Sequence, residues 1–212
     1  LPTNRALRRR GNDAGAMRKF WIDLGLTQKD ISVPMSTLNS LNAKAVDAEA
    51  PRLSFVREPR TIKLDISEIE MDKVTLPIHP EHPDKGVREW PLGDNPLKVK
   101  IASEDFTSRE ARRLKDFADI GIHHKKTVGG WTGDISRTDR YGNTPIIHWL
   151  PSNMAQPAVL LLEEDGELVA AEGLLEVNDY PDGTVVQLER MGFAILEGTE
   201  EDGARRLVRL HG

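Results

Sequence analysis

The spacing of apolar residues divides the chain into a short helical segment and a longer strand-rich segment. In the first 50 residues, apolar side chains recur every three or four positions, as at Phe20, Trp21 and Leu24, which is the spacing along one face of an α-helix. Three such runs follow residues whose side-chain oxygens are suited to capping a helix, namely Thr3, Asp13 and Ser36. The pattern predicts three helices before residue 51, with Trp21 in their core.

From residue 51 onward the apolar period shortens to two, which is typical of half-buried β-strands. Pro, Gly and Asp separate the runs, and many short strands between turn residues are typical of sandwiches and barrels. One segment, 103–115, has the pattern of an isolated helix. The predicted fold is mainly β with an N-terminal α-helical subdomain. The expected strands lie at 53–56, 61–65, 74–76, 97–101, 146–149, 158–162, 168–170, 185–188, 193–196 and 207–210.

Charge is distributed unevenly along an acidic chain. The 212 residues include 29 Lys and Arg against 34 Asp and Glu, a net charge of −5, and an acidic total argues weakly against binding to nucleic-acid phosphates. The first 19 residues, however, contain six basic side chains and a single acid, Asp13. A second basic cluster lies within 109–115. Local basic surfaces are therefore available on an acidic protein.

The composition also limits the chemistry. The chain has no cysteine, which excludes disulfides and thiolate metal sites and suits a reducing, cytoplasmic location. No apolar run approaches the roughly 18 residues of a membrane span. Glycine-rich phosphate loops and nucleophile elbows are absent. His79 and His82 are flanked by Pro80 and Pro83, which favours a solvated turn over a metal site. We expect no catalytic residue and no metal ligand.

Four segments in this order resemble the C-terminal half of glutamyl- and glutaminyl-tRNA synthetases. They read LPTNRALRRRG, NAKAVDAEAPRLSFV, IHPEHPDKGVRE and VQLERMGF, and they lie at 1–11, 42–56, 78–89 and 186–193. Each segment alone is weakly specific, but their order and spacing also match. The chain is therefore similar to the anticodon-binding region of the archaeal and eukaryotic type of glutamyl-tRNA synthetase, a class I family.

This resemblance implies a particular division of the chain. A helical connector would occupy 1–50, a proximal β-barrel would be built from 51–115 and 178–212, and a distal barrel at 116–177 would be inserted in it. The catalytic domain, with its ATP and Mg²⁺, would precede this fragment, which starts at Leu1 rather than at a methionine. We expect the intact enzyme to attach glutamate to tRNA and this fragment to be non-catalytic, without a cofactor of its own.

The resemblance also implies the residues that contact RNA. Unstacked anticodon bases expose edges that suit guanidinium and amide groups, and the residues at the matching positions are Arg52, Gln187 and Arg190. The alternative for these residues is an ion pair at the rim of a barrel. Basic residues expected to contact the tRNA backbone are Arg8, Arg9, Arg10, Lys125, Lys126 and Arg137. Trp131 and Tyr141 are expected to anchor loops, and Trp149 to pack in a barrel.

Three further interpretations stay open. The same region of a glutaminyl enzyme is a close rival, because the barrels of the two enzymes are homologous, although the helical segment 18–33 is more similar to the archaeal glutamyl form. The partner would be tRNA-Glu, with tRNA-Gln as the alternative. A protein-docking scaffold is a different class of function, and an apolar surface patch would favour it over a basic groove. A ribosomal RNA-binding barrel is the third, and the N-terminal helical segment argues against it.

Overall fold

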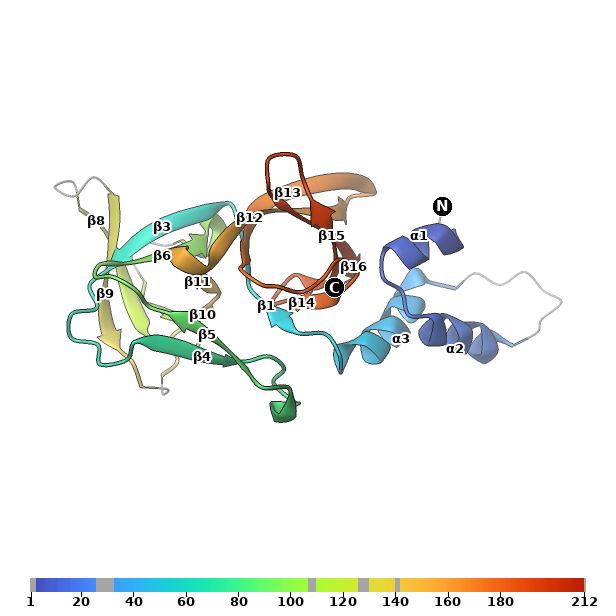
Figure 1. Cartoon of the computed structure of the whole chain (residues 1–212), viewed down its shortest axis with the longest axis horizontal. Coiled ribbons are helices and arrows are strands. Elements are labelled where there is room, and N and C mark those ends of the chain that lie inside the picture. Colours follow the sequence, from blue (N-terminus) through green and yellow to red (C-terminus); the bar gives the residue numbers. More distant parts are fainter. Residues whose placement is uncertain (1–2, 26–32, 107–109, 126–129, 140–141, 212) are drawn as a thin grey trace.

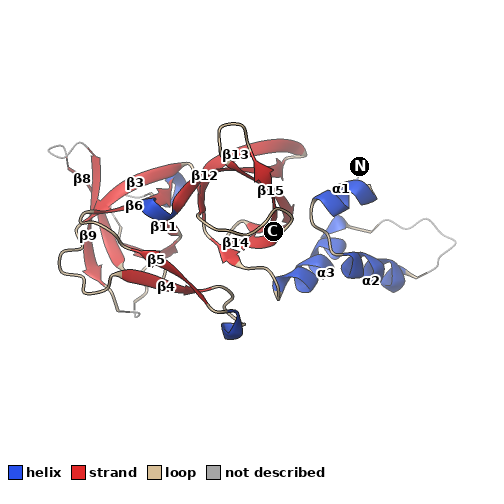
Figure 2. Cartoon of the chain, in the orientation of Figure 1, coloured by secondary structure: helices blue, strands red, loops and turns tan. Residues whose placement is uncertain are grey.

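In the computed structural model, the helices gather at one end of the molecule and the strands form two nearly closed, barrel-shaped sheets (Figure 1). Figure 2 shows the same separation of the three α-helices from the strands, with short 3₁₀ turns among the strands. The structure describes residues 3–25, 33–106, 110–125, 130–139 and 142–211. The three longer helices are α1 (Asn4–Arg9), α2 (Ala14–Leu24) and α3 (Met35–Asp47). The predicted helical subdomain and mainly-β class are both confirmed.

Side-chain caps begin the first two helices. The Thr3 hydroxyl oxygen accepts a hydrogen bond from the Ala6 N–H at 3.2 Å, and the Asp13 carboxylate accepts one from the Ala16 N–H at 2.8 Å. Such bonds satisfy N–H groups that the first turn of a helix leaves unpaired. The third helix begins at Met35 without a side-chain cap, so the predicted start after Ser36 was wrong.

The prediction that Trp21 lies in the helical core was also wrong. Phe20 is 8% exposed and packs with Leu7 and Leu38, whereas Trp21 is 64% exposed and its neighbour Ile22 is 68% exposed. Successive residues of an α-helix point about 100° apart, so burial of Phe20 turns the next side chain toward solvent.

The first sheet, which we call barrel A, combines two distant parts of the chain. Its strand order is β1-β14-β15-β16-β12-β13-β2. Only Ser54 separates β1 from β2, so one kinked segment pairs with β14 at one edge and with β13 at the other and thereby closes the sheet. The strands are β1 (Arg52–Leu53), β2 (Phe55–Arg57), β12 (Ala155–Glu164), β13 (Glu167–Glu176), β14 (Val185–Leu188), β15 (Gly192–Thr199) and β16 (Arg205–His211).

The second sheet, barrel B, is built from the intervening residues 59–151. Its order is β10-β7-β8-β9-β3-β6-β11, and only His148 separates the two edge strands β10 and β11. The kinked segment 146–151 thus closes barrel B, as the kinked segment 52–57 closes barrel A. The strands are β3 (Pro59–Leu64), β6 (Leu97–Ala102), β7 (Arg112–Leu114), β8 (Asp119–Lys125), β9 (Gly130–Arg137), β10 (Ile146–Ile147) and β11 (Trp149–Pro151).

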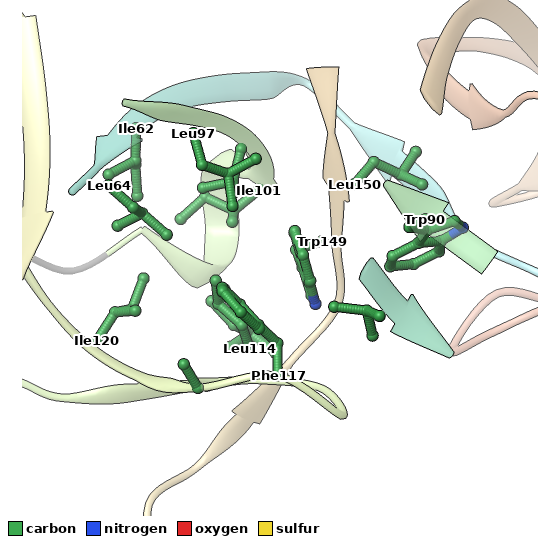
Figure 3. Close-up of a cluster of buried hydrophobic side chains, with 14 of the residues drawn as sticks. Ile62, Leu64, Trp90, Leu97, Ile101, Leu114, Phe117, Ile120, Trp149 and Leu150 are labelled. Carbon is green, nitrogen blue, oxygen red and sulfur yellow. The ribbon is translucent and has the colours of Figure 1, made fainter. Parts of the chain in front are cut away.

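A hairpin of β4 (Lys73–Pro77) and β5 (Val87–Pro91) covers one side of barrel B and forms a separate two-stranded sheet. Trp90 of this hairpin is 2% exposed and lies edge-on to Trp149, with ring centroids 5.3 Å apart. Trp149 also stacks on Phe117, as Figure 3 shows within the buried cluster of this barrel. The expectation that Trp149 packs in a barrel is confirmed. The described part of the chain also contains three short 3₁₀ turns, η1 (Pro83–Lys85), η2 (Ser103–Asp105) and η4 (Ser152–Met154).

The strand pairing divides the chain at other places than we expected. One barrel is inserted in the other, as predicted, but its strands span 59–151 and not 116–177. β3 pairs with β6 and, in parallel, with β9, which places residues 59–102 in barrel B. The hairpin β12–β13 pairs with β16 and β2 and so belongs to barrel A. These strand pairings join residues that are distant in the sequence, and no local sequence pattern predicts them.

The helix expected over 103–115 is not formed. The described part of this segment contains the short turn η2 and the strand β7, whose Leu114 is fully buried in the core of barrel B. β7 pairs in parallel with β10 and antiparallel with β8. Pairing with two neighbouring strands therefore overrides the local helical pattern.

Candidate nucleic-acid interface

A pocket of about 290 Å³ lies where the two barrels meet the β4–β5 hairpin. Its walls come from three places: β1, β14 and the β14–β15 turn of barrel A, the segments after β7 and β10 of barrel B, and the hairpin with its loop. Figure 1 shows β1 and β14 on the side of barrel A that faces the hairpin. The lining residues are Arg52, Leu76, Pro77, Pro80, Arg88, Lys115, His148, Gln187, Glu189 and Arg190. All three residues expected to read bases are among them.

The pairing of β1 with β14 brings Arg52 and Gln187 side by side. The two strands are parallel, with Arg52 opposite Gln187 and Leu53 opposite Leu188. Both leucines are at most 2% exposed and belong to the core of barrel A. Since side chains alternate between the faces of a strand, Arg52 and Gln187 point out of the barrel. Gln187 is half-buried, and its amide makes no hydrogen bond with the residues that the structure describes.

Arg52 also ties barrel A to the end of helix α3. The residue is 8% exposed. Its Nη1 donates to the Ala50 carbonyl at 3.0 Å, and its Nη2 donates to the Asp47 carboxylate at 2.9 Å. A cation is favourable at this position because the carbonyl end of a helix carries partial negative charge. Arg52 therefore stabilises the fold and lines the pocket at the same time.

His79 adds a second donor at the end of α3. Its Nε2 lies 2.9 Å from the Asp47 carbonyl oxygen, and its Nδ1 accepts from the Glu81 N–H at 3.1 Å. A ring nitrogen that accepts a hydrogen bond is unprotonated, so Nε2 carries the proton and donates it. His79 is fully buried, which corrects the expectation of a solvated turn. Its burial follows from docking of the η1 loop against α3.

The β14–β15 turn carries Glu189 and Arg190 into the pocket. Arg190 has a φ of 67°, in the left-handed region that non-glycine residues seldom adopt. Its Nη1 lies 2.5 Å from the carboxylate of Asp105 in η2, and the side chains are 47% and 12% exposed respectively. The ion pair expected as the alternative role of Arg190 is thus present, with a partner from barrel B.

Glu189 faces barrel B as well. Its Oε2 lies 2.8 Å from His148 Nδ1, and its Oε1 accepts a hydrogen bond from the Lys115 ammonium. Burial raises the pKa of Glu189, but the contacts with His148 and Lys115 outweigh burial and lower the pKa from 4.5 to about 2. Glu189 is therefore ionised at neutral pH, and it joins the two barrels beside the pocket.

Arg88 forms the wall of the pocket on the hairpin side. Its Nη1 donates to the Arg52 carbonyl, and its Nε lies 2.9 Å from Oε1 of Glu176, a carboxylate that is almost fully buried. The other bonds to Glu176 come from Trp90 Nε1 at 2.7 Å and from the Ser54 N–H at 3.1 Å. Burial raises the pKa of Glu176, and Arg88 and Trp90 oppose the rise. This buried network fixes the hairpin to the kink that closes barrel A.

Sequence reasoning missed Arg88, Lys115 and His148 as pocket residues. Arg88 lies in one of the four segments that carry the family resemblance, and Lys115 lies in the second basic cluster, so both had a weak signal. His148 was interpreted as a structural histidine, and it does contact Glu189. Only the meeting of two barrels shows that the three residues share one pocket.

The described arginines among those expected along the tRNA backbone lie in two places, at the end of α1 and in β9. Arg8 is exposed and makes no side-chain hydrogen bond or ion pair within the described residues. Arg9 forms two bonds with Glu197, one of 3.0 Å, and Arg10 lies 3.5 Å from Glu163. These two arginines therefore join α1 to barrel A.

The remaining expected backbone contacts lie in barrel B. Arg137 donates to Asp139 at 2.8 Å on an exposed surface. The side chain of Lys125 and the whole of Lys126 lie outside the described residues, as does Tyr141. Trp131 belongs to strand β9 rather than to a loop, and it packs edge-on against Phe106 with ring centroids 4.4 Å apart.

Two features are absent from the part of the chain that the structure describes. No group of three or more acidic or histidine side chains is placed to hold a metal ion. No described helix is long and apolar enough to cross a membrane.

Comparison with known proteins relates this chain to a family. Residues 50–138 match the model of the anticodon-binding domain of class I tRNA synthetases of the E and Q type. The chain is 34% identical over 206 residues to a glutamate–tRNA ligase of Methanosarcina acetivorans, an alignment that covers 95% of this chain and 34% of the relative. A Pyrococcus furiosus glutamate–tRNA ligase is 32% identical over 212 residues, with 95% and 36% covered. The chain thus spans about a third of the length of these relatives.

Proposed function

Because the chain belongs to the anticodon-binding region of the class I glutamyl- and glutaminyl-tRNA synthetase family, we propose that the pocket between its barrels receives a base of the anticodon loop of tRNA-Glu. One observation carries the proposal: Arg52 lies far from Gln187 and Arg190 in the sequence, yet all three line the same pocket. At about 290 Å³, the pocket lies at the lower limit of sites for drug-sized molecules, which suits a single base.

The pocket offers the chemistry that a base edge needs. Gln187 supplies a donor beside an acceptor, and Arg190 supplies the N–H groups that Asp105 does not occupy. Arg52 lines the pocket with its Nη groups already bonded to α3, so its contribution to binding is a fixed positive charge. Arg8 and Arg137 are proposed to contact phosphates, together with Arg9, Arg10, Lys125 and Lys126. Such contacts add affinity without sequence information.

The activity of the whole protein is part of the same proposal. The intact protein would join glutamate to tRNA with ATP and Mg²⁺ in a catalytic domain and act in the cytoplasm, and the region described here would hold the anticodon. The glutaminyl alternative differs in the tRNA, so binding to tRNA-Gln belongs in the same experiment.

The test is binding of the isolated chain to unmodified tRNA-Glu and tRNA-Gln transcripts and to variants altered at one anticodon position, across a salt series. We expect each important anticodon change to weaken binding to the wild-type chain, by roughly 1–3 kcal/mol per lost contact on the protein–DNA scale. Gln187→Ala and Arg190→Ala should abolish this difference. Arg206→Ala is the matched control, because it removes an arginine that pairs with Glu200 away from the pocket.

Binding that is absent, or that ignores the anticodon at low salt, would contradict the proposal for this region. In that case the exposed pair Trp21 and Ile22 would favour the second candidate, a protein-docking role, since adjacent exposed apolar side chains favour contact with protein. Substitution of both residues by serine would then weaken association with a protein partner without changing RNA binding.

A further inference from the structure

Arg190 approaches the pocket with one end of its guanidinium already held. Nη1 lies 2.5 Å from Asp105 Oδ2, and no other side-chain bond of Arg190 is formed within the described residues. Nε and Nη2 therefore retain their N–H groups for a ligand. An unrestrained arginine side chain samples many rotamers and loses rotamer entropy when it is fixed, so an arginine that is held beforehand binds a ligand at a lower entropic cost.

Asp105 is itself held on a rigid support. It ends η2 (Ser103–Asp105), and Ser103 and Phe106, on either side of it, both contact barrel B. Ser103 accepts a 2.9 Å hydrogen bond from Arg60 Nε, and Phe106 packs against Trp131 with the Arg60 guanidinium 5.7 Å from its ring. The Asp105 side chain is only 12% exposed. Its carboxylate is therefore a fixed point of barrel B that reaches a residue of barrel A.

The β14–β15 turn is attached to barrel B at two adjacent residues. Glu189 contacts Lys115 and His148, and Arg190 contacts Asp105. Two attachments fix both the position and the orientation of the turn, whereas one would leave it free to rotate. The orientation of the free end of the Arg190 guanidinium is thus set by barrel B, although Arg190 belongs to barrel A.

We propose that Asp105 is a positioning residue for base recognition: it holds Nη1 of Arg190 so that the remaining N–H groups of the guanidinium face a base in the pocket. This inference rests on the proposed function of the pocket. Asp105 does not touch the RNA, and its negative charge weakens general attraction to phosphates. Removal of that charge should therefore lower discrimination between anticodons while it leaves total affinity for RNA unchanged or higher, a combination that simple unfolding does not produce.

The experiment compares wild type, Asp105→Asn and Asp105→Glu in binding to the tRNA-Glu transcript and its single-position anticodon variants. We expect Asp105→Asn to reduce discrimination about tenfold, the scale of one lost directed contact. Asp105→Glu should restore part of the discrimination, because it keeps the carboxylate. Glu200→Gln is the control, since it breaks the Arg206–Glu200 pair away from the pocket and should leave discrimination unchanged.

A second measurement needs no RNA. The Nη1–H resonances of Arg190, which belong to the nitrogen that pairs with Asp105, should be distinct and slow to exchange in the wild-type chain and should merge with those of exposed arginines in Asp105→Asn. Unchanged discrimination and an unchanged resonance in a folded Asp105→Asn chain would overturn the positioning role of Asp105 and leave the proposed function of the pocket standing. A wild-type chain that ignores the anticodon would instead overturn the proposed function, and the positioning role with it. Equal weakening on every transcript would show a merely structural role for Asp105.

Discussion

Arg190 occupies a backbone conformation that suits glycine, and this allows the role of its side chain to be separated from the stability of its turn. Its φ of 67° costs a non-glycine residue about 1–2 kcal/mol. Arg190→Gly relieves this cost and loses an ion pair of which one partner is half exposed, worth about 0–1 kcal/mol. We expect the free energy of unfolding to stay the same or to rise by up to about 2 kcal/mol, while anticodon discrimination is lost.

Denaturant unfolding and transcript binding measure the two effects of Arg190→Gly separately. Arg190→Ala is the control, because it removes the same side chain but keeps the unfavourable φ, and it should be the less stable variant. A large fall in the stability of Arg190→Gly would show that the side chain mainly maintains the turn.

Ionisation of Glu189 makes the stability of the folded protein depend on pH. Its pKa is lowered from 4.5 to about 2, so the ionised carboxylate stabilises the folded state fully above about pH 5, and this stabilisation is lost as the pH falls from about 4.5 toward 2. We expect Glu189→Gln to lower the free energy of unfolding at pH 7 by at most about 3 kcal/mol. The difference from wild type should shrink progressively below pH 4.5.

Denaturant unfolding of both proteins at pH 7, 5, 4 and 3 tests this prediction. Glu201→Gln, at an exposed position in the β15–β16 turn, should show no such trend. A difference between wild type and Glu189→Gln that stays constant with pH would mean that the lost interaction is one of packing rather than of charge.

The sequence predicted the residues of the pocket better than their contacts. Arg52, Gln187 and Arg190 were identified through family resemblance, and all three line one pocket. Their partners were not predictable from the residues alone. Asp105 precedes Arg190 by 85 positions, and nothing in its neighbourhood distinguishes it from other surface acids until the barrels are placed together.

At the scale of elements, the closure of barrel A depends on close approach between β13 and β2. Gly173 of β13 lies opposite Arg57 of β2, and a Cβ at Gly173 would lie 2.6 Å from the Val56 carbonyl oxygen and 2.6 Å from the Phe55 ring. A backbone atom of a paired strand cannot move aside easily. We expect Gly173→Ala to destabilise the protein by about 1–3 kcal/mol, the usual effect of forcing a methyl group into a packed site.

Thermal unfolding checks this prediction, and Gly130→Ala in β9 is its control. Apart from its chain neighbours, no atom of the described residues lies within 4 Å of a Cβ built at Gly130, so that variant should unfold close to the wild-type temperature. If Gly173→Ala were equally stable, the edge of barrel A would have to be open enough to accept a methyl group.

Local patterns predicted most elements and failed where tertiary pairing outweighs them. The residues with alternating apolar and polar side chains at 97–101 form β6, and the predicted caps Thr3 and Asp13 do begin helices. The segment 103–115 has a helical pattern, yet Leu114 is buried in the core and β7 pairs on both sides. Strands this short are stabilised by their neighbours rather than by their own residues, so local reasoning assigns them poorly.

At the scale of the whole molecule, Arg52 joins the helical subdomain to the pocket. Arg52→Met leaves the Asp47 carboxylate and the Ala50 carbonyl without their donor. We expect this variant to lose about 1–3 kcal/mol of stability, the usual penalty for hydrogen-bonding groups left unsatisfied, and to show faster amide exchange in the last turn of α3. Native-state hydrogen exchange measures both effects.

Asp47→Ala separates the two roles of Arg52. It removes the same ion pair but leaves the guanidinium in the pocket. If RNA binding weakens in Arg52→Met and not in Asp47→Ala, the guanidinium acts directly on the RNA. Equal weakening in both variants would assign the effect of Arg52 to the placement of α3.

The sequence predicted the arrangement of the subdomains but not the boundaries between the two barrels. A helical segment followed by one barrel inserted in another was expected and is present, yet the inserted barrel spans 59–151 rather than 116–177. Strand spacing does not determine which of several similar strands will pair across a long stretch of chain. The parallel pairing of β3 with β9 shows this, because no hairpin turn connects the two strands.

The insertion fixes the order in which the protein can fold as it is made. Barrel B is continuous in the chain, so all its strands have left the ribosome before the second part of barrel A, 155–211, has been translated. The kinked segment 52–57 must wait for its partners β13 and β14. At typical rates of translation this delay is on the order of ten seconds. The pocket, which needs both barrels, is therefore among the last features of the molecule to form.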